Sequence, residues 1–382
     1  RNGYSALVMA PTEVLAQQHH RTFSELLEPL GVRVELLSGS MTVKQKAEVR
    51  ARAESGETGV LIGTQALIQK SSVVKNAGLV IVDEQHRFGV AQRAALAEKG
   101  AAPHILAMSA TPIPRTLALI VYGDLEVSVL NEMPRGRLPV KTYAVDSTFR
   151  QRVYNFIKKH IAAGRQAYIV CPLVENSEGK SEKASAIEYY NGLVNGDFRD
   201  IPTGLLYGKL KQSEKDRVMA EFKSGSLKLL VSTTVIEVGI DVPNAVVMLI
   251  ENAEQFGLSQ LHQLRGRVGR GSEQSFCILM SDSRSEYTKA RTDVMVRTTD
   301  GFEIAREDLR LRGSGNFFGR EQHGLPPLKV ADIADDSAVL EEVDKLAGEI
   351  LRADPTLSDE KSRMLRSGVE RLFGTNGDYG WN

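Results

Sequence analysis

The chain has 382 residues, a length that suggests two or three domains. Apolar residues make up 42% of it and charged residues 25%, as in an ordinary globular protein, and no apolar run approaches the ~20 residues of a membrane-spanning helix. Because 48 basic side chains balance 48 acidic ones, the composition excludes a uniformly basic nucleic-acid-binding protein but allows local basic surfaces.

The cysteines concern the cellular compartment of the chain, and its first residues concern its extent. Cys171 and Cys277 lie far apart, each within an apolar run. We interpret them as buried thiols in the reducing cytoplasm, with no disulfide framework and no zinc pattern. The chain starts Arg1-Asn2-Gly3-Tyr4, without an initiator methionine or a signal peptide, so we expect it to be part of a longer protein.

Short apolar runs alternate with helix-like segments in the first third of the chain. The runs are continuous, which is typical of strands that are buried on both faces. The intervening segment 12–27 has its apolar residues on one side of a predicted helix. This alternation predicts a parallel α/β sheet with right-handed crossovers. The predicted strands are 6–10, 32–37, 59–63, 79–82 and 105–108.

The pattern then starts again after a break. The segment 131–141, NEMPRGRLPVK, contains two prolines, one glycine and three basic residues, a composition that predicts a linker. A second series of apolar runs predicts a second parallel α/β domain. After about residue 285 the runs stop, and the rest is predicted to be mainly helical. The second series is 167–171, 204–207, 227–232, 245–250 and 275–280.

Small and hydroxyl residues follow several predicted strands. In open parallel sheets, ligands bind outside the carboxyl ends of the strands. Free backbone N–H groups and hydroxyls at such junctions can bind phosphate. Each junction alone is also explained by the preference of Ser and Thr for helix N-caps. Four junctions along one rim, however, could follow a sugar-phosphate backbone: Pro11-Thr12, Gly63-Thr64, Ser109–Thr111 and Ser232–Thr234.

Two adjacent carboxylates, Asp83 and Glu84, end the apolar run 79–82. An aspartate at the end of a buried strand can hold Mg²⁺ beside nucleotide phosphates. The neighbouring glutamate can orient an attacking water. The alternative is a helix N-cap followed by a first-turn acid.

The segment 262–271, HQLRGRVGRG, interleaves arginines with glycines. Glycines let a backbone approach a ligand closely, and guanidinium groups match phosphate oxygens. An exposed loop that only solvates the surface would not need this spacing. Upstream, Glu237, Gly239 and Asp241 stand just before the predicted strand 245–250.

Together these segments stand in the order of the superfamily 2 helicase motifs, which the chain resembles from residue 5 to about 280. The stretch 298–324 resembles the translocation motif shared by RecG and the transcription-repair coupling factor. The tetrad DEQH at 83–86, the segment 110–137 and the short distance from the translocation motif to the end of the chain favour the RecG family. The chain as a whole resembles the carboxy-terminal motor part of that family.

The resemblance implies a fold of two RecA-like parallel-sheet domains followed by a mainly helical region. The first domain would span 1–138 and be incomplete before the first strand. The second would span 139–285. Residues 286–382 would hold the translocation motif and a tail.

The resemblance also implies roles for individual residues, with ATP and Mg²⁺ as cofactors. Asp83 would hold the Mg²⁺, Glu84 would position the hydrolytic water, and Arg267 and Arg270 would act as arginine fingers beside Gln263. Gly239 and Asp241 would contact the nucleotide. The implied DNA contacts are Pro11, Thr12, Gly63, Thr64, Thr233 and Thr234. The implied coupling residues are Gln85, His86, Ser109, Thr111, Gly313, Gly315, Gly319, Gln322 and His323.

One departure concerns the phosphate-binding loop, because no G-x-x-x-x-G-K-[ST] occurs in the 382 residues. That loop anchors the nucleotide phosphates. In the family it lies shortly before the first strand, so we expect the chain to begin just after it. The amino-terminal wedge domain that recognises branched DNA is also missing. We therefore expect the chain by itself to be deficient in ATP hydrolysis.

The resemblance implies an ATP-dependent helicase that remodels branched double-stranded DNA, such as stalled forks and Holliday junctions, in recombination and repair. We expect a cytoplasmic monomer without a membrane partner, and the family allows a contact with single-strand-binding protein. Two alternatives stay open: a transcription-coupled repair translocase, and a non-catalytic DNA-binding or scaffold protein on a helicase fold.

Overall fold

The structure is a computed structural model that describes residues 3–67, 74–84, 103–109, 127–130, 132–134, 136–172, 182–233, 242–312 and 337–373. By its internal contacts the chain divides into two units. The first comprises Arg1–Thr111 and Met133–Thr299 and contains two parallel sheets. The second comprises Pro112–Glu132 and Asp300–Asn382.

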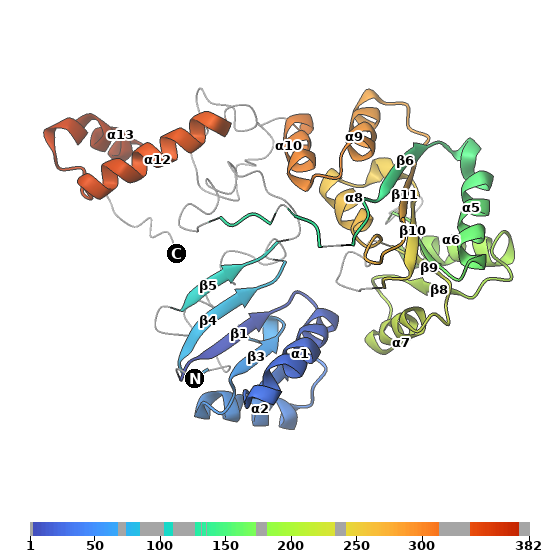
Figure 1. The fold of residues 1–382 in the computed structure, drawn as a ribbon, viewed down its shortest axis with the longest axis horizontal. Coiled ribbons are helices and arrows are strands. Elements are labelled where there is room, and N and C mark those ends of the chain that lie inside the picture. The colour runs from blue at the N-terminus through green and yellow to red at the C-terminus, as the bar shows by residue number, and fades with distance from the viewer. Residues whose placement is uncertain are drawn as a thin grey trace. The chain divides into compact units, whose positions relative to one another are not determined.

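The first sheet has five parallel strands in the order β2-β3-β1-β4-β5 (Figure 1). Helices α1 and α2 connect its first strands, as strand–helix alternation predicted. The elements are β1 (Ser5–Met9), α1 (Glu13–Leu27), η1 (Glu28–Leu30), β2 (Val34–Leu37), α2 (Val43–Ser55), β3 (Val60–Gly63), η2 (Gln65–Leu67), β4 (Ala77–Val82) and β5 (His104–Ala107).

Strand β1 shows why its apolar run is continuous. Successive side chains of a strand point to opposite faces of the sheet. Leu7 and Met9 belong to one buried cluster, and Val8 and Ala10 belong to another that includes Leu15 of α1. Both faces of the strand are therefore covered, which explains the continuous apolar run.

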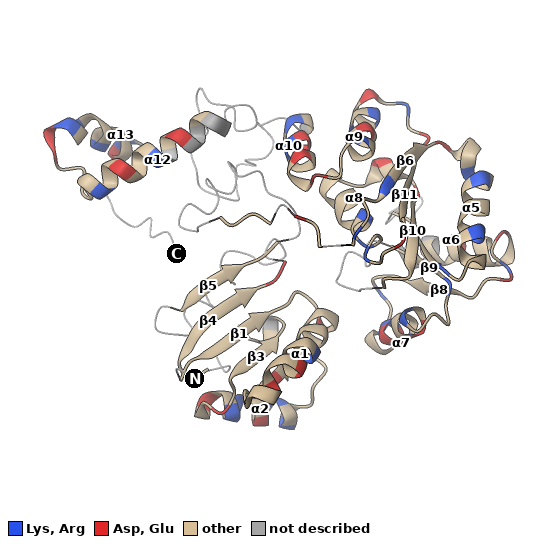
Figure 2. Cartoon of the chain, in the orientation of Figure 1, with Lys and Arg blue, Asp and Glu red and all other residues tan. Residues whose placement is uncertain are grey.

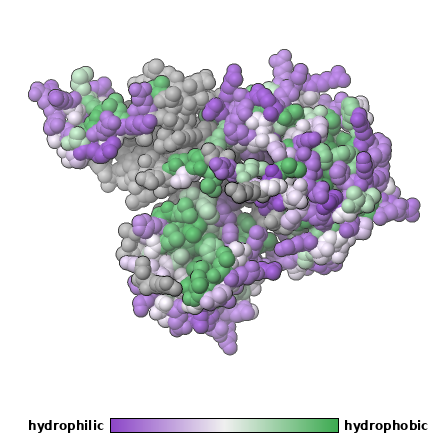
Figure 3. Space-filling model, in the orientation of Figure 1, coloured by the Kyte–Doolittle hydropathy of each residue, from purple (hydrophilic) through white to green (hydrophobic). Residues whose placement is uncertain are grey.

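Strand β5 differs from this prediction. Ile105 is 43% exposed and Leu106 is 48% exposed, so the prediction of burial on both faces is wrong for this strand. It lies at the edge of the sheet, where β4 is its one neighbour among the described strands. Figure 3 shows hydrophobic residues gathered over this sheet on the face turned to the viewer.

The second sheet has six parallel strands in the order β6-β11-β10-β7-β9-β8. Three of these strands, β10, β7 and β9, are buried at every residue, as continuous apolar runs predict. The elements are β6 (Lys141–Val145), η4 (Ser147–Phe149), α5 (Arg150–Ala162), β7 (Gln166–Val170), α6 (Glu182–Asn195), β8 (Thr203–Leu206), α7 (Gln212–Lys223), β9 (Leu229–Ser232), β10 (Ala245–Ile250), η6 (Ala253–Gln255), α8 (Leu258–Arg265), β11 (Phe276–Met280) and α9 (Glu286–Arg297).

Strand β6 was not predicted from the sequence. It lies at the edge of the sheet and, within the described part of the chain, pairs with β11 alone, in the register Phe276 to Lys141. Tyr143 is largely exposed, so the strand lacks the continuous buried run that marks its neighbours. The predicted linker 131–141 therefore ends where β6 begins, at Lys141.

Helices follow the second sheet, as predicted for the last part of the chain. Asp300 accepts a hydrogen bond from the Phe302 amide at 2.8 Å and so caps the start of α10. Ile304 and Leu309 are the buried apolar residues of this helix. The elements are α10 (Gly301–Arg312), α12 (Ser337–Ala353), η7 (Glu360–Ser362) and α13 (Arg363–Phe373).

Charged residues and cysteines occupy different parts of the fold. In Figure 2 the charged residues lie on helices and loops, and the strands of both sheets are nearly free of them. Cys171 and Cys277 are both free and buried, as predicted. Burial raises the pKa of the Cys171 thiol to about 11 and that of Cys277 to about 12. Among the described residues, no helix has the length and apolar character needed to cross a membrane.

Gly63 ends β3 where no side chain fits. A Cβ atom there would lie 2.4 Å from the Leu37 carbonyl oxygen and 3.0 Å from Leu67 Cγ. A backbone atom cannot move aside as the end of a flexible side chain can. The glycine therefore has a structural reason, which is independent of any ligand.

We expect Gly63→Ala to lower the free energy of unfolding of the chain by about 1–3 kcal/mol, as overpacking of a core does. Urea denaturation followed by circular dichroism measures it. Gly192→Ala is the control, because a Cβ at that position in α6 would meet nothing within 4 Å. It should raise stability by up to about 1 kcal/mol. Equal losses in both variants would contradict the steric explanation.

Candidate functional site

The carboxyl ends of β3, β1, β4 and β5 form one rim of the first sheet. Backbone hydrogen bonds continue the strand pairing past the strand ends: Ala10 N–H donates to Gly63 O at 2.9 Å, and Asp83 N–H donates to Met9 O at 2.9 Å. Met108 N–H likewise donates to Val82 O at 2.8 Å. This pairing brings together four of the predicted positions, in the order Thr64, Thr12, Asp83 and Ser109.

The Asp83 carboxylate is held at both oxygens. His19 Nε2 lies 2.8 Å from Oδ2, and the Glu84 backbone N–H donates to Oδ1 at 2.9 Å. Both side chains of the His19–Asp83 pair are only partly exposed. The carboxylate therefore has a defined orientation at the end of β4.

Glu84 adopts a left-handed backbone conformation with φ +50°. Such a conformation is uncommon for a residue with a side chain and costs of order 1–3 kcal/mol. The hydrogen bond from Glu84 N–H to Asp83 helps to hold it. The two adjacent carboxylates are thus placed by a strained junction at the end of β4.

The donor set at this junction suits Mg²⁺. Within the part of the chain that the structure describes, no group of three or more His, Cys, Asp or Glu side chains could hold a metal ion. Mg²⁺ at nucleotide sites typically uses one or two carboxylates together with substrate phosphates and water. Asp83 fits as the protein's ligand for such an ion.

Thr12 serves as the N-cap of α1, with its hydroxyl oxygen 3.4 Å from the Leu15 amide nitrogen. The alternative interpretation of this junction, in which Thr12 is a helix N-cap, therefore agrees with the structure. Pro11, the preceding residue, is half-buried, and the Thr64 carbonyl accepts a hydrogen bond from Leu67 N–H at 3.0 Å. Contact with a phosphate at this rim would fall mainly to backbone N–H groups.

A hydrogen-bonded group beside this rim was missed in the sequence. Glu13 accepts from the Ser40 N–H at 2.7 Å and from the Ser40 hydroxyl at 2.6 Å. Burial by itself would raise the pKa of the Glu13 carboxyl, but the hydrogen bonds from Ser40 and Ser38 outweigh it and lower that pKa. The signal was Ser38-Gly39-Ser40 directly after a predicted strand.

In the second sheet, Thr233 lies at the end of β9 and is buried. Its N–H donates to Leu206 O at 3.1 Å. Its hydroxyl oxygen is buried and has no hydrogen-bond partner among the described residues. An orphaned hydroxyl at the carboxyl end of a parallel strand is consistent with a ligand contact.

The arginines of the segment 262–271 have different environments. Arg265, the last residue of α8, is buried and donates to Met295 O at 2.9 Å and Thr298 O at 2.8 Å. Burial lowers its pKa. Arg267 is also buried, whereas Arg270 is partly exposed and donates to Gly266 O at 3.1 Å. Gln263 is half-buried on α8. Arg265 is therefore a structural residue. Arg267 and Arg270 remain the candidates for the arginine fingers.

Glycines in this segment allow close packing. Gly269 has φ +79°, and a Cβ there would lie 2.6 Å from Val140 Cγ2. A Cβ at Gly271 would lie 2.7 Å from the Pro243 carbonyl oxygen. The glycine spacing is thus explained by backbone contacts within the second domain as well as by access to a ligand.

A partly buried ionic network around Glu251, at the end of β10, was also missed. Glu251 is buried and accepts from both terminal nitrogens of Arg150, Nη2 at 3.0 Å, and from the Tyr189 hydroxyl at 2.8 Å. Burial alone would lower the pKa of Arg150, but the bonds to Glu251 and Tyr154 raise it. Burial and the nearby Glu251 charge raise the pKa of Tyr189. The network joins α5 and α6 to the connection that leads into α8.

The other predicted residues lie outside the described residues. They are the nucleotide contacts Gly239 and Asp241, the DNA contact Thr234, and the coupling residues Gln85, His86, Thr111, Gly313, Gly315, Gly319, Gln322 and His323.

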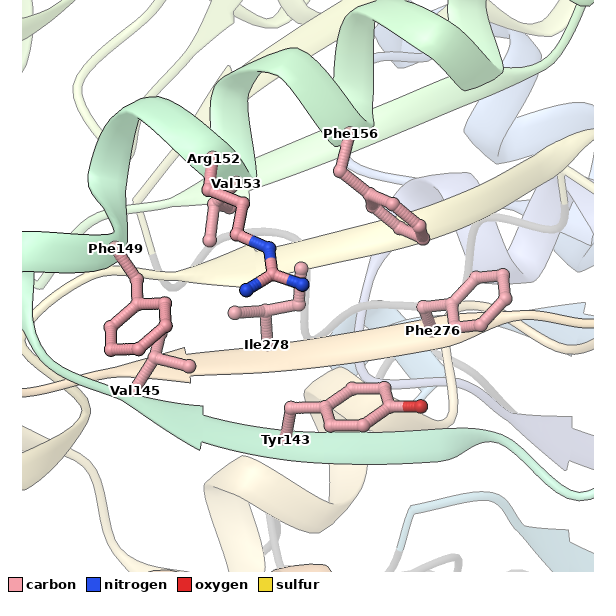
Figure 4. Close-up of a pocket in the computed structure, with 8 residues that line it drawn as sticks. All are labelled: Tyr143, Val145, Phe149, Arg152, Val153, Phe156, Phe276 and Ile278. Carbon is pink, nitrogen blue, oxygen red and sulfur yellow. The ribbon is translucent and has the colours of Figure 1, made fainter.

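A groove of about 330 Å³ lies between α5 and the strands β6 and β11 (Figure 4). Its wall includes the aromatic rings of Tyr143, Phe149 and Phe156, and the Arg152 guanidinium reaches over its apolar floor. None of the predicted site residues lines it.

Three protein-family profiles match the chain. "DEAD/DEAH box helicase" matches residues 1–120, and "Helicase conserved C-terminal domain" matches residues 150–272. "ATP-dependent DNA helicase RecG, domain 3, C-terminal" matches residues 298–380.

Curated relatives match nearly the whole chain. The ATP-dependent DNA helicase RecG of Bacillus subtilis is 48% identical over 373 residues, 96% of this chain and 54% of the relative. The RecG of Synechocystis is 48% identical over 377 residues, 98% of this chain and 45% of the relative. The chain thus spans about half the length of the curated relatives it matches.

Solved structures give the same result. A structure of RecG bound to a three-way DNA junction has a TM-score of 0.69 and 46% identity, and covers 89% of this chain and 44% of that one. The Mycobacterium smegmatis helicase Lhr, bound to single-stranded DNA and AMP-PNP, has a TM-score of 0.56 at 18% identity over 78% of this chain and 42% of that one. The second likeness shows the fold alone.

Because Arg265 is buried and Arg270 is partly exposed, their substitution should lower the free energy of unfolding by different amounts. We expect Arg265→Ala to lower the free energy of unfolding by about 2–4 kcal/mol, because it removes two charge-assisted hydrogen bonds and leaves two carbonyls unpaired. Arg270→Ala, the matched control, should lower it by less than about 1 kcal/mol. Urea denaturation of residues 1–382 measures both. Similar losses would show that the two arginines have similar structural roles.

Proposed function

The chain belongs to the RecG family of ATP-dependent DNA helicases, and we propose that it forms the motor part of such an enzyme. In this role ATP hydrolysis drives the remodelling of branched double-stranded DNA, at stalled forks and Holliday junctions, in recombination and repair. The observation that supports it most is the rim of the first sheet, where Asp83 and Glu84 stand beside the junctions after β3, β1 and β5. The RecG relative bound to a three-way junction supports branched DNA as the substrate.

The proposed hydrolysis begins with Asp83, whose carboxylate would hold Mg²⁺ beside the nucleotide phosphates. When bound, Mg²⁺ supplies positive charge that neutralises the charge developing on the transferred phosphoryl group. Glu84 would accept a hydrogen bond from the attacking water and orient it in line with the bond that breaks. The left-handed backbone of Glu84 gives this side chain a direction different from that of a regular helix start.

Arg267 and Arg270 would supply the positive charge on the other side of the phosphates. Guanidinium groups stabilise the equatorial oxygens in the transition state because their donors are already oriented. Gln263, which lies on α8 shortly before Arg267, would contact the same phosphates. Gly239 and Asp241 would contact the nucleotide from the second domain.

DNA contacts in the proposal come from the strand ends of both sheets. Pro11, Thr12, Gly63 and Thr64 would meet the sugar-phosphate backbone through backbone amides and hydroxyls, and Thr233 and Thr234 would do so in the second domain. Such contacts hold a strand without reading its sequence, which suits an enzyme that moves along DNA.

Coupling in the proposal passes through two groups of residues. Gln85, His86, Ser109 and Thr111 would respond to the state of the γ-phosphate. Gly313, Gly315, Gly319, Gln322 and His323 would convert closure of the domains into movement along the duplex. We also propose that the motor acts as a monomer and can contact single-strand-binding protein.

A non-catalytic DNA-binding role has one observation in its favour: the 382 residues contain no G-x-x-x-x-G-K-[ST]. Against it, the chain retains Asp83 and Glu84 as well as Arg267 and Arg270. A protein that only binds DNA does not need both halves of a hydrolysis site. We therefore propose the motor function.

The first test uses a full-length version, in which this chain is joined to the remaining part of its RecG relatives. We expect Glu84→Gln to keep ATP binding and to lower junction-stimulated ATP hydrolysis at least ~10²-fold, because an amide cannot act as a base. Phosphate release with three-way junction DNA measures it. The 382-residue chain alone serves as a low-turnover control. Normal turnover and unwinding by Glu84→Gln would refute the role of Glu84.

The second test concerns the arginines in the same full-length version. Arg267→Ala and Arg270→Ala should each lower kcat roughly 10³-fold or more, as expected for a lost arginine finger. Arg284→Ala, at an exposed arginine outside the site, is the matched control and should change kcat less than about twofold. Losses below about tenfold for both site variants would favour simple surface charge.

A further inference from the structure

His19 connects α1 to the end of β4. Its Nε2 lies 2.8 Å from Asp83 Oδ2, although 64 residues separate the two in the sequence. An ionised carboxylate only accepts hydrogen bonds, so His19 donates to it through Nε2–H. The His19 ring also lies edge-on to Phe23, with ring centroids 6.5 Å apart, and Phe23 packs on a core cluster of the first domain. The imidazole is thus held on two sides.

The two donors to Asp83 leave room for a further ligand. His19 occupies one site on Oδ2, and the Glu84 N–H occupies one site on Oδ1. A carboxylate has about four lone-pair sites, so each oxygen keeps one for a metal ion or for water bound to it. The two bonds fix the rotation of the carboxylate without consuming its capacity as a ligand.

An ordinary surface ion pair explains this contact less well. Exposed pairs contribute about 0–1 kcal/mol and tolerate varied geometry. The His19 and Asp83 side chains are only 25% and 20% exposed. The adjacent His20, on the same helix, has no bonding partner among the described residues.

We propose that His19 is a positioning residue, which orients the Asp83 carboxylate for Mg²⁺ and ties it to α1. The inference rests on the proposed function, because it takes Asp83 as the Mg²⁺ ligand. Partners in the outer shell of a metal ligand typically change metal affinity about 10–100-fold when they are removed. His19 has this relation to Asp83.

The experiment compares three substitutions in the full-length version. His19→Met removes the donor and keeps a side chain of similar reach, His19→Gln keeps a donor at that reach, and His20→Met is the matched control on the same helix. Two quantities are measured with ADP and three-way junction DNA: the dissociation constant for Mn²⁺, by electron paramagnetic resonance, and the Mg²⁺ concentration that half-saturates ATP hydrolysis when ATP replaces ADP. Melting temperatures identify any variant that fails to fold.

We expect His19→Met to raise both quantities at least about tenfold, while its kcat at saturating Mg²⁺ and its DNA affinity stay within about threefold. His19→Gln should stay within about threefold of the unsubstituted protein in both quantities, and His20→Met within about twofold. Equal behaviour of His19→Met and His20→Met, or of His19→Met and His19→Gln, overturns the proposal. If the unsubstituted protein hydrolyses no ATP, the proposed function fails, and the Mn²⁺ measurements alone still decide the role of His19.

Discussion

The parallel pairing of β1 with β3 and β4 is the constraint on which the first domain depends. Its backbone hydrogen bonds reach past the strands, from Ala10 to Gly63 and from Asp83 to Met9. They determine that the loops after three strands leave from one rim. Because continuous apolar runs cover both faces of β1, the apolar pattern alone would not distinguish one register from the next. The backbone hydrogen bonds fix the register and therefore the position of Asp83 at the proposed site.

The strands could be predicted from the sequence because burial on both faces of a strand produces a continuous apolar run. Each predicted run overlaps one strand of the structure. β6 escaped prediction because an edge strand needs no continuous apolar run, and a proline- and glycine-containing segment leads directly into it. The exposure of β5 could not be predicted either, since a continuous apolar run does not reveal whether both faces of a strand will be covered.

The candidate site was only partly predictable, for a different reason. Asp83 and Glu84 stand out because they end an apolar run, but His19 lies within a helix where nothing local marks it. Its partner is 64 residues away. Arg265 and Arg270 look alike in the sequence, and only tertiary contacts distinguish the buried donor to two backbone carbonyls from the partly exposed Arg270. The role of Glu251 likewise becomes evident only from its contacts with Arg150 of α5 and Tyr189 of α6.

The close approach of Gly269 to Val140 has a consequence for both segments. Val140 precedes β6, the strand through which the chain enters the second sheet, and a Cβ at Gly269 would lie 2.6 Å from Val140 Cγ2. Gly269 lies between Arg267 and Arg270 in the sequence, so the segment that carries both arginines packs closely against the residue that leads into β6. A larger residue at either position would displace the other, and the sequence at the entrance to the second sheet and that of the arginine segment therefore constrain each other.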